Sequence, residues 1–503
     1  MSSRTHDDWL QAARTVTPAA QLYLDGGYVD ALDGATFPAE SGRDGTVLTK
    51  VAAGSAPDVD RAVMSARAAF DDGRWRDQAP RARGAVLRRL GELMLEHADE
   101  LALLETLDVG KPIGESVRVD VPSAAGVFTW YGEAVDKLYD AVAPVGAGAL
   151  ATITREPLGV VGAVVPWNYP LILTSWKLGP ALATGNSVVL KPAEQSSLSA
   201  LLLARLATEA GLPDGVLNVV TGYGESAGEP LGRHAGVDKI AFTGSEEIGK
   251  RFQTYAGESN GKIVAVEAGG KSPHLVLADV PDLDAAASAI AWGVFYNAGQ
   301  TCHAGTRLVV HESVREPLLA KLVELAGTFR PGDPLDPSTT LGPLVDRRQL
   351  ERVLGYLDLA RAEGADVVTG GGALDPTAQG APDGAALVAP TVLDRVRQDS
   401  PVNQDEIFGP VLTTTSFDDV DEGVRLANDT RFGLAAAVWT GSVGTAHRVA
   451  RRLRAGTVWV NTYDASSVVT PFGGFGASGS GRDRSLAALD AYTAAKTTWI
   501  DLS

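Results

Sequence analysis

The chain has a single cysteine, Cys302, within the segment Gly299-Gln300-Thr301-Cys302-His303-Ala304-Gly305. One cysteine excludes an intramolecular disulfide and a cysteine-based zinc site. A lone thiol is most often an inert, buried residue. Here its neighbours are small and polar, and the two glycines permit tight turns and close approach of a ligand to the backbone. This context favours a nucleophilic thiol.

Two polar side chains at the ends of predicted apolar strands could assist such a thiol. Glu267, followed by Ala268-Gly269-Gly270, could be a general base that activates water. A helix cap or an ion pair with Lys271 are the alternatives. Asn168, in Pro166-Trp167-Asn168, could donate a hydrogen bond to a developing oxyanion. Asparagine at such a place is also a common turn residue.

Lys191 and Glu194 follow another predicted strand, in Lys191-Pro192-Ala193-Glu194. Such a pair could bracket the hydroxyls of a ribose, with the carboxylate as acceptor. The carboxylate would repel a 2′-phosphate, which favours NAD over NADP. A surface salt bridge is the alternative interpretation.

Two glycine patterns compete as the loop that binds a dinucleotide. The segment Gly222–Gly228 has one residue too many for Gly-x-Gly-x-x-Gly, and Glu225 would face a pyrophosphate. The segment Phe242–Gly249 follows a strand directly and opens a helix, so its amides and Ser245 suit a phosphate. We prefer the second pattern.

The elements that must position these residues alternate between strands and helices. Apolar strands divided by helices predict a parallel sheet covered on both faces, with ligands bound outside the carboxyl ends of the strands. A second α/β series is expected from His274 to about Asn461. The predicted strands are 160–165, 187–190, 216–220, 239–242, 263–266 and 307–311, and the predicted helices are 197–210, 246–255 and 283–296. Two extended segments, 150–155 and 497–502, could form an arm that pairs with another subunit.

The length and the net charge of the chain limit the classes of protein to which it can belong. At 503 residues the chain is expected to form two or more domains. Its net charge of −18 disfavours binding to nucleic acid or anionic membranes. Met1–Gln11 lacks the apolar run of a signal peptide, and prolines interrupt the longest apolar stretch, Leu158–Trp176. We expect a soluble, cytoplasmic protein.

Taken together, these segments resemble the aldehyde dehydrogenase superfamily over nearly the whole chain. Seven blocks occur in the family's order. They are Pro166-Trp167-Asn168, Lys191-Pro192-Ala193-Glu194, Phe242-Thr243-Gly244-Ser245, Glu267-Ala268-Gly269-Gly270-Lys271, Gly299-Gln300-Thr301-Cys302, Glu406-Ile407-Phe408-Gly409-Pro410-Val411 and Pro471-Phe472-Gly473-Gly474.

The resemblance implies catalytic roles for five residues. Cys302 would be the nucleophile, Glu267 would ready it or the hydrolytic water, and Asn168 and the Cys302 amide would form the oxyanion hole. A carboxylate at position 267 argues for hydrolysis, because CoA-acylating relatives lack one. Lys177 and Asp483 match positions linked to a proton relay, but many members have Glu where Asp483 stands, and the shorter side chain puts its relay role in doubt.

The resemblance also implies how an NAD cofactor is held, with NADP as a weaker alternative. Lys191 and Glu194 would hold the adenosine ribose, Ser245 a phosphate, and Glu406 the nicotinamide ribose. The implied cofactor contacts are Pro166, Trp167, Lys191, Ala193, Glu194, Gly224, Phe242, Gly244, Ser245, Gly269, Glu406 and Phe408. No metal is implied.

The fold implied is a Rossmann-type NAD-binding domain, an α/β catalytic domain and a β oligomerisation arm. We expect the NAD-binding domain in 1–136 and 156–266, the catalytic domain in 267–464, and the arm in 137–155 and 484–503. The expected partners are a small aldehyde and further copies of the chain in a homodimer or homotetramer.

Within the superfamily the chain is most similar to γ-glutamyl-γ-aminobutyraldehyde dehydrogenases and related aminoaldehyde enzymes. The similarity rests on segments such as Tyr255–Asn260, Val460–Asp464 and Gly481–Leu486. Asp120 matches a position where aminoaldehyde enzymes have a carboxylate near the substrate entrance, so it could attract an ammonium group; the alternative is an exposed helix carboxylate. The implied substrate contacts are Asp120, Trp176, Thr301, His303 and Phe472.

Two questions stay open at this point. His303 is either a tunnel-lining residue or a hydrogen-bonded structural one. The alternative functions are a broad-specificity aldehyde dehydrogenase, a thiol esterase without redox chemistry, and an inactive structural homologue. The nucleotide-type residues Lys191, Glu194 and Glu406 argue against an esterase.

Overall fold

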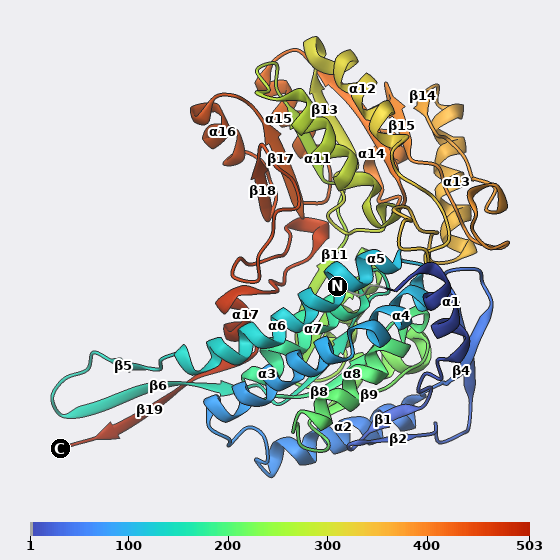
Figure 1. Ribbon diagram of the computed structural model, residues 1–503. Coiled ribbons are helices and arrows are strands. Elements are labelled where there is room, and N and C mark those ends of the chain that lie inside the picture. The colour runs from blue at the N-terminus through green and yellow to red at the C-terminus, as the bar shows by residue number, and fades with distance from the viewer. Residues whose placement is uncertain (1–3) are drawn as a thin grey trace.

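The computed structural model describes residues 4–503, and Figure 1 shows two α/β bodies and a long arm. The first body contains a seven-stranded sheet in the order β11-β10-β7-β8-β9-β1-β2. β7 to β11 run parallel, and the hairpin of β1 and β2 extends the sheet in antiparallel fashion. Its strands are β1 (Leu22–Leu24), β2 (Gly27–Val29), β7 (Val160–Val164), β8 (Ser187–Lys191), β9 (Leu217–Val219), β10 (Lys239–Gly244) and β11 (Ile263–Ala268).

The second body contains another seven-stranded sheet, in the order β14-β15-β16-β13-β12-β17-β18. All neighbours in it are parallel except β14 and β15. Its strands are β12 (Pro273–Val276), β13 (Arg307–His311), β14 (Asp366–Thr369), β15 (Thr391–Asp394), β16 (Val411–Phe417), β17 (Ala435–Trp439) and β18 (Thr457–Val460). β3 (Thr36–Glu40) and β4 (Val47–Ala52) form a separate hairpin-like pair.

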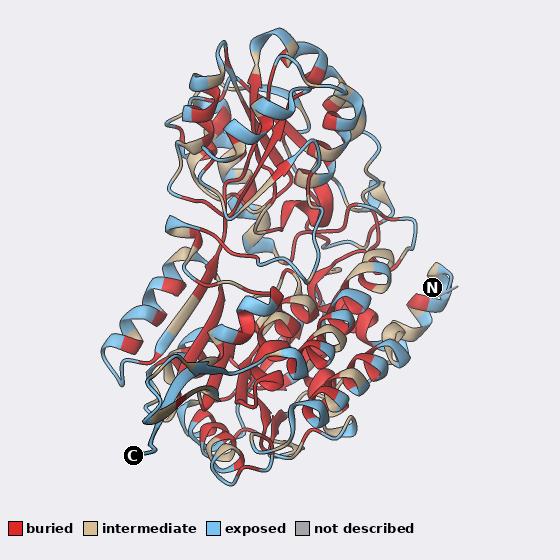
Figure 2. Cartoon of the chain, turned by 90° about the vertical axis from the view of Figure 1, so that its left-hand side faces the viewer, coloured by how far each residue is buried: buried red, intermediate tan, exposed pale blue. Residues whose placement is uncertain are grey.

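Helices cover both faces of the first sheet, as the continuous apolar strands predicted. Val161 and Ala163 of β7 point into one core beneath α3, α6, α7 and α8, whereas Val160 and Val164 point into a second core beneath α2 and α10. Figure 2 shows these strands as buried and the outer helical surfaces as exposed. The helices of this body are α2 (Ala56–Asp71), α3 (Pro80–Glu96), α4 (Ala98–Val109), α5 (Ile113–Glu115), α6 (Val121–Ala134), α7 (Pro170–Ala183), α8 (Leu198–Glu209), α9 (Glu229–Arg233) and α10 (Glu246–Gly257).

The remaining helices belong mainly to the second body. They are α11 (Leu283–Phe295), α12 (Glu312–Ala326), α13 (Arg347–Ala362), α14 (Pro401–Gln404), α15 (Val420–Asn428), α16 (Val443–Ala450) and α17 (Ser485–Ala491). Short 3-10 or π turns are η1 (Ser116–Asp120), η2 (Val135–Lys137), η3 (Glu194–Ser196), η4 (Gly224–Gly228), η5 (Tyr296–Gly299), η6 (Thr377–Gln379) and η7 (Gly476–Ser478).

The strand ends differ from the prediction where they matter for chemistry. Glu267 was expected to follow its strand, but it lies inside β11, directly opposite Thr243 of β10. Parallel pairing with β10 continues through Gly244 and Ala268, so the backbone of Glu267 is fixed by the sheet. The carboxylate therefore projects from a rigid strand and not from a loop.

The arm is a three-stranded antiparallel sheet that extends from the first body (Figure 1). It consists of β5 (Ala141–Ala143), β6 (Ala149–Pro157) and the terminal β19 (Thr493–Asp501). β19 begins four residues before the predicted segment 497–502, because its pairing with β6 starts at Thr493 and Pro157. Trp499 is 62% exposed and is flanked by exposed Ile500 and Leu502, so the arm displays apolar side chains.

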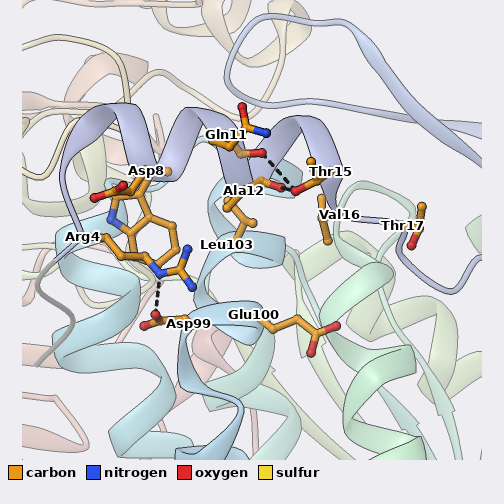
Figure 3. Close-up of a pocket in the computed structure, with 11 residues that line it drawn as sticks. Arg4, Asp8, Gln11, Ala12, Thr15, Val16, Thr17, Asp99, Glu100 and Leu103 are labelled. Atoms are coloured by element: carbon orange, nitrogen blue, oxygen red, sulfur yellow. Dashed lines mark hydrogen bonds and ion pairs between the residues drawn. The ribbon is translucent and has the colours of Figure 1, made fainter.

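The first described helix, α1 (His6–Thr15), packs on the first body through buried Trp9. Thr5 and Asp8 cap it reciprocally, and Figure 3 shows the hollow beneath it, whose rim includes Arg4 paired with Asp99. The hollow lies apart from the residues that were predicted to act on a substrate. Positions 1–3 of the predicted segment 1–136 lie outside the described residues. Between residues 4 and 503, no helix is long and apolar enough to cross a membrane.

Candidate active site

A cavity of about 290 Å³ lies where the carboxyl ends of β7, β10 and β11 face the second body. It brings together nine of the predicted site residues from segments far apart in the sequence. These are Pro166, Trp167, Asn168, Gly244, Ser245, Gly269, Cys302, Glu406 and Phe408. Five further residues line the cavity and were not predicted from the sequence: Leu173, Thr243, Ala268, Gln349 and Arg352.

The loop that carries Cys302 follows α11 and has an unusual backbone. Asn297, Ala298 and Gly299 have φ values of 50°, 53° and 71° in succession. A non-glycine residue in this left-handed region costs free energy, so the surrounding structure must hold it there. At Gly299 a Cβ atom would lie 2.1 Å from the carbonyl oxygen of Gly409, so only glycine fits. The loop is thereby locked, and it leaves Cys302 partly exposed at the cavity.

Asn168 ties this loop to the end of β7. Its Nδ2 donates to the carbonyl oxygen of Gln300 at 2.9 Å, and its own backbone oxygen accepts from Asn297 Nδ2 at 3.2 Å. The turn interpretation of Asn168 is too limited, because the side chain is 3% exposed and bridges two elements. An amide nitrogen carries two hydrogens, so one remains to donate to an oxygen in the cavity beside Cys302.

Glu406 enters the cavity from the second body. Gly269 is required opposite it, because a Cβ there would lie 2.1 Å from both carboxylate oxygens. Gly270 N donates to Glu406 Oε1 at 3.2 Å. Burial raises the pKa of Glu406 to about 7, against the opposing effect of the Gly270 amide. The carboxylate is thus held by the β11 end and presented to the cavity.

The wall beside Glu406 is apolar and is positioned by α13. Phe408 contacts Trp167 edge to face, with ring centroids 5.4 Å apart. Gln349 Nε2 donates to the Phe408 carbonyl at 2.8 Å, and Arg352 Nη2 donates to the Glu406 carbonyl at 2.6 Å. Neither α13 residue belongs to a glycine-rich or strand-end pattern, which is why the sequence analysis overlooked them.

The other residues that were predicted to bind the dinucleotide lie outside this cavity, around the ends of β8 and β10. Lys191 Nζ lies 3.4 Å from Glu194 Oε2. The salt bridge of the alternative interpretation is present, but Lys191 is only 4% exposed, so its side chain is not a solvated surface group. Burial lowers the pKa of Lys191, partly offset by the Glu194 carboxylate. Glu194 and Tyr223 line a second cavity, of about 680 Å³. Ala193 is buried between the paired residues, and Gly224 begins η4 after Tyr223.

Ser245 and Phe242, both in the segment Phe242–Gly249 that we preferred as the dinucleotide loop, have different surroundings. Ser245 caps α10, with its Oγ accepting from Ile248 N at 3.3 Å, at the N-terminal end where backbone amides favour an anion. The ring of Phe242 packs in the core against Phe252, with centroids 5.0 Å apart. Phe242 therefore supports the strand from inside and does not line the cavity.

Glu267 lies in a buried cluster with Lys177 and Asp483. Neither carboxylate oxygen of Glu267 has a hydrogen-bond partner among the described residues. The alternative of an ion pair with Lys271 is wrong, since Lys271 Nζ donates to the Val402 carbonyl at 2.9 Å. Burial, and next the charge of Asp483, raise the pKa of Glu267 well above its ordinary value.

Asp483 reaches Lys177 in spite of its short side chain. Lys177 Nζ lies 2.6 Å from Asp483 Oδ2, and both side chains are buried. The backbone of Asp483 is fixed by two hydrogen bonds with Phe472, through its N–H and its carbonyl, and from this position the short side chain reaches Lys177. The pair needed for a relay is therefore present.

None of the four predicted substrate contacts other than Asp120 lines the cavity that contains Cys302, but His303 lies beside the Cys302 sulfur. Trp176 and Phe472 have ring centroids 5.2 Å apart, and Phe472 contacts His303 at 5.6 Å. Thr301 Oγ1 lies 2.7 Å from the hydroxyl of Tyr169. Tyr169 was not predicted from the sequence as a site residue.

Arg484 was also overlooked near these residues. Its guanidinium carbon lies 4.9 Å from the Trp176 ring centroid and 5.0 Å from that of Phe472. Arg484 belongs to a segment that was assigned to the arm, but its side chain packs on Trp176 and Phe472, and its backbone φ is 63°.

Asp120 does not lie on the surface of its helix. It is fully buried and paired with Lys111, whose Nζ is 3.7 Å from the ring centroid of Tyr169. The alternative of an exposed helix carboxylate is wrong. One oxygen, Oδ1, has no hydrogen-bond partner among the described residues. Burial raises the pKa of Asp120, whereas Lys111 lowers it.

Comparison with known proteins identifies the family to which a chain with this site belongs. The model of the aldehyde dehydrogenase family matches residues 28–498. NADP/NAD-dependent aldehyde dehydrogenase PuuC of Escherichia coli is 49% identical over 98% of both chains. The structure of γ-glutamyl-γ-aminobutyraldehyde dehydrogenase from Burkholderia cenocepacia has a TM-score of 0.96 and 52% identity, covering 99% of this chain and 100% of that one.

A third relative was solved with ligands. Indole-3-acetaldehyde dehydrogenase AldA of P. syringae, in complex with NAD+ and IAA, has a TM-score of 0.97 and 50% identity, covering 99% of this chain and 100% of that one. Full-length similarity of this degree gives the chain the fold of these enzymes and their NAD(P)-dependent oxidation of aldehydes. The chain belongs to the aldehyde dehydrogenase family.

Proposed function

We propose that the chain oxidises an aminoaldehyde, such as γ-glutamyl-γ-aminobutyraldehyde, to the acid through a thiohemiacetal and a thioester on Cys302. The observation that carries the proposal is that Cys302, Asn168 and Glu406 line one cavity. An esterase could use the thiol and the amide donor of this cavity, but it would have no use for a carboxylate that binds a ribose.

The cavity fits a nicotinamide nucleotide. Trp167 and Phe408 supply apolar walls, and the buried Thr243 Oγ1 has no hydrogen-bond partner among the described residues, so it can serve a ligand. Glu406 would hold the ribose on that side, and Lys191 with Glu194 the second ribose. The bound cofactor supplies an acceptor for the hydride that leaves the substrate carbon.

The residues of the chain carry out the remaining steps. The Cys302 thiolate forms a C–S bond to the aldehyde carbon, and the carbonyl electron pair moves to oxygen. The free hydrogen of the Asn168 amide stabilises that oxygen, a contribution of about 10²–10³ in rate for such a donor. Loss of hydride leaves a thioester. Glu267, whose carboxylate oxygens have no hydrogen-bond partner among the described residues, takes a proton from the water that releases the acid.

Two carboxylates near the aromatic residues of the substrate side support an aminoaldehyde, although each has a cationic partner: Asp120 pairs with Lys111 and Asp464 with His303. The hydroxyl of Tyr296 is buried there without a hydrogen-bond partner, and Asp120 and Asp464 act on it electrostatically. Negative charge and aromatic faces together stabilise an ammonium group. The name of the B. cenocepacia relative supports the same substrate class.

The arm and the two sheets suggest how the whole enzyme is built. We propose that the first sheet (1–136 and 156–266) binds the dinucleotide, that 267–464 carries the thiol, and that the arm (137–155 and 484–503) pairs subunits into a dimer or tetramer. Exposed Trp499 and Ile500 on the arm support pairing. We also propose that the enzyme works in the cytoplasm; its net charge of −18 favours solubility.

The test is NADH formation by the purified protein with NAD or NADP and a panel of aldehydes that includes 3-aminopropanal and propanal. Aminoaldehydes with NAD should give the highest kcat/KM. Cys302→Ala should lower NADH formation to background while leaving the unfolding midpoint unchanged. Ester cleavage by the wild type without NADH from any aldehyde would establish the esterase alternative instead.

A further inference from the structure

We propose that His303 and Asp464 form a proton-accepting dyad beside the Cys302 sulfur, so that the enzyme holds its nucleophile as a thiolate–imidazolium pair. This inference rests on the proposed role of Cys302 as nucleophile. It gives a function to the histidine that the sequence left unexplained.

Both ring nitrogens of His303 make the contacts that define the dyad. Nδ1 lies 3.7 Å from Cys302 Sγ, and Nε2 lies 2.8 Å from Asp464 Oδ1. A neutral imidazole has one N–H and one lone pair. When Nε2–H donates to the Asp464 carboxylate, the lone pair of Nδ1 faces the thiol. The arrangement is that of a base oriented by a carboxylate, with a nucleophile on its other side.

The ring is held so that this contact is maintained. The hydroxyl of Tyr463 donates to the backbone carbonyl of His303. The ring packs between Phe472 and Trp459, with centroid distances of 5.6 Å and 6.0 Å. Asp464 lies on a tight bend, with a φ of 58°. The side chain of His303 is about 15% exposed, so water competes little for its nitrogens.

The local charges favour a protonated His303. Burial lowers its pKa, but the charge of Asp464, the hydrogen bond to it and the contact with Cys302 together outweigh burial, and the pKa of His303 is raised to about 10. A histidine with that pKa stays an imidazolium through neutral pH and favours a negative charge on the neighbouring sulfur. Titratable groups from the other elements that face Cys302 are Glu267 on β11, Tyr169 before α7, Tyr463 after β18 and Arg484 before α17.

In this scheme two bases each accept a different proton: His303 accepts that of the thiol, and Glu267 accepts one from water. The proton of the Cys302 thiol moves to Nδ1 of His303, and the S–H electron pair stays on sulfur as the thiolate. The imidazolium keeps this proton while the thioester forms and is hydrolysed, because the leaving sulfur departs as a thiolate. Glu267 is then needed only for water.

The test is alkylation of the full-length enzyme by iodoacetamide, without NAD or aldehyde. An unassisted thiol, with a pKa of about 8.5, is about 1% ionised at pH 6.5. Wild-type rates at about pH 6.5 and about pH 9.5 should therefore agree within about threefold if the thiolate is preformed. His303→Gln should lower the rate at the lower pH at least about tenfold and leave the rate at the higher pH within about threefold.

Two further variants keep the test decisive. Asp464→Asn fits the left-handed backbone, since asparagine tolerates positive φ, and should fall between wild type and His303→Gln at the lower pH. The control His447→Gln, on the exposed face of α16, should match wild type. If His303→Gln does not fold, the Asp464→Asn profile decides the question.

Three results would overturn the dyad. They are an unchanged profile in His303→Gln, an equal loss at both pH values, and an Asp464→Asn profile identical to that of wild type. Alkylation requires no turnover, so these results are independent of whether NADH is formed. The failure of the dyad and the failure of the proposed function are therefore distinguishable.

Discussion

Two buried acid clusters in the first body have the same composition and different surroundings. The first, the thiol-side cluster, consists of Glu267, Lys177 and Asp483. The second, the helix-side cluster, consists of Glu105, Lys111 and Asp120. Each contains one lysine–aspartate ion pair and one glutamate, and all six residues are at most 4% exposed.

The two glutamates differ in their hydrogen bonds. Glu105, on α4, accepts from Leu171 N at 2.7 Å and so serves the amide-rich first turn of α7. Glu267 accepts from no group among the described residues. Both have raised pKa values, chiefly through burial. A raised pKa alone therefore does not mark a catalytic acid; the absence of a structural hydrogen bond distinguishes the one that can exchange protons with a substrate.

The largest expected contrast is in the rate of turnover. Glu267→Gln should lower kcat by about 10²–10⁴-fold, the usual contribution of a general base, while a rapid first burst of NADH remains. Glu105→Gln should leave kcat within about threefold, because its hydrogen-bonding oxygen is kept. Stopped-flow NADH absorbance separates burst from turnover. A lost burst in Glu267→Gln would mean that Glu267 also forms the thiolate, against the dyad.

The two lysines should matter for stability in both clusters. Lys177→Met or Lys111→Met leaves a buried aspartate without its partner, which costs about 3–5 kcal/mol of unfolding free energy. Lys111→Met combined with Asp120→Asn should recover most of the loss, whereas Lys177→Met with Asp483→Asn should recover stability but not kcat. Urea unfolding and NADH assays measure the two effects. Full activity in the second double variant would remove the relay role of the pair.

Glu105 should give the helix-side cluster a dependence of stability on pH. Burial, and next the charge of Asp120, raise the pKa of Glu105 from 4.5 to about 8. Between these values the folded state binds more protons than the unfolded chain, so the unfolding free energy of the wild type falls as pH rises through this window. Glu105→Gln should be more stable relative to wild type at pH 8 than at pH 5 by about 1 kcal/mol or more. Parallel urea-unfolding profiles would contradict this.

The smallest expected effect concerns the substrate. Asp120→Asn should lower the ratio of kcat/KM for 3-aminopropanal to that for propanal by about threefold to tenfold, because Lys111 already neutralises part of the carboxylate's charge. The matched change Asp108→Asn alters a different buried carboxylate, on α4, which accepts from Leu198 N, and should leave the ratio unchanged. An equal ratio in both variants would restrict Asp120 to a structural role.

Many of the strands could be predicted from the sequence, because the buried strands of a parallel sheet consist of continuous apolar residues. β13 was predicted with its observed bounds, and β8, β10 and β11 to within two residues. The hairpin of β1 and β2 was not predicted, since three-residue strands carry no readable periodicity.

The candidate site was predictable only where residue type and strand end coincide. Cys302, Asn168 and Glu406 fall in one cavity, as the resemblance implied they would. The contact of His303 with Asp464 spans 161 positions and the pairing of Lys111 with Asp120 depends on a π turn, so neither follows from local spacing. Burial of Asp120 was missed for the same reason.

The pairing of β6 with β19 has a consequence for synthesis of the chain. From Pro157 to Thr493 the ribosome must add 336 residues before the two strands can meet. At about 5–20 residues per second this takes roughly 20–70 s, during which one edge of β6 stays unsatisfied. Nascent chains on neighbouring ribosomes present the same free edge, so assembly of the arm competes with aggregation until translation ends.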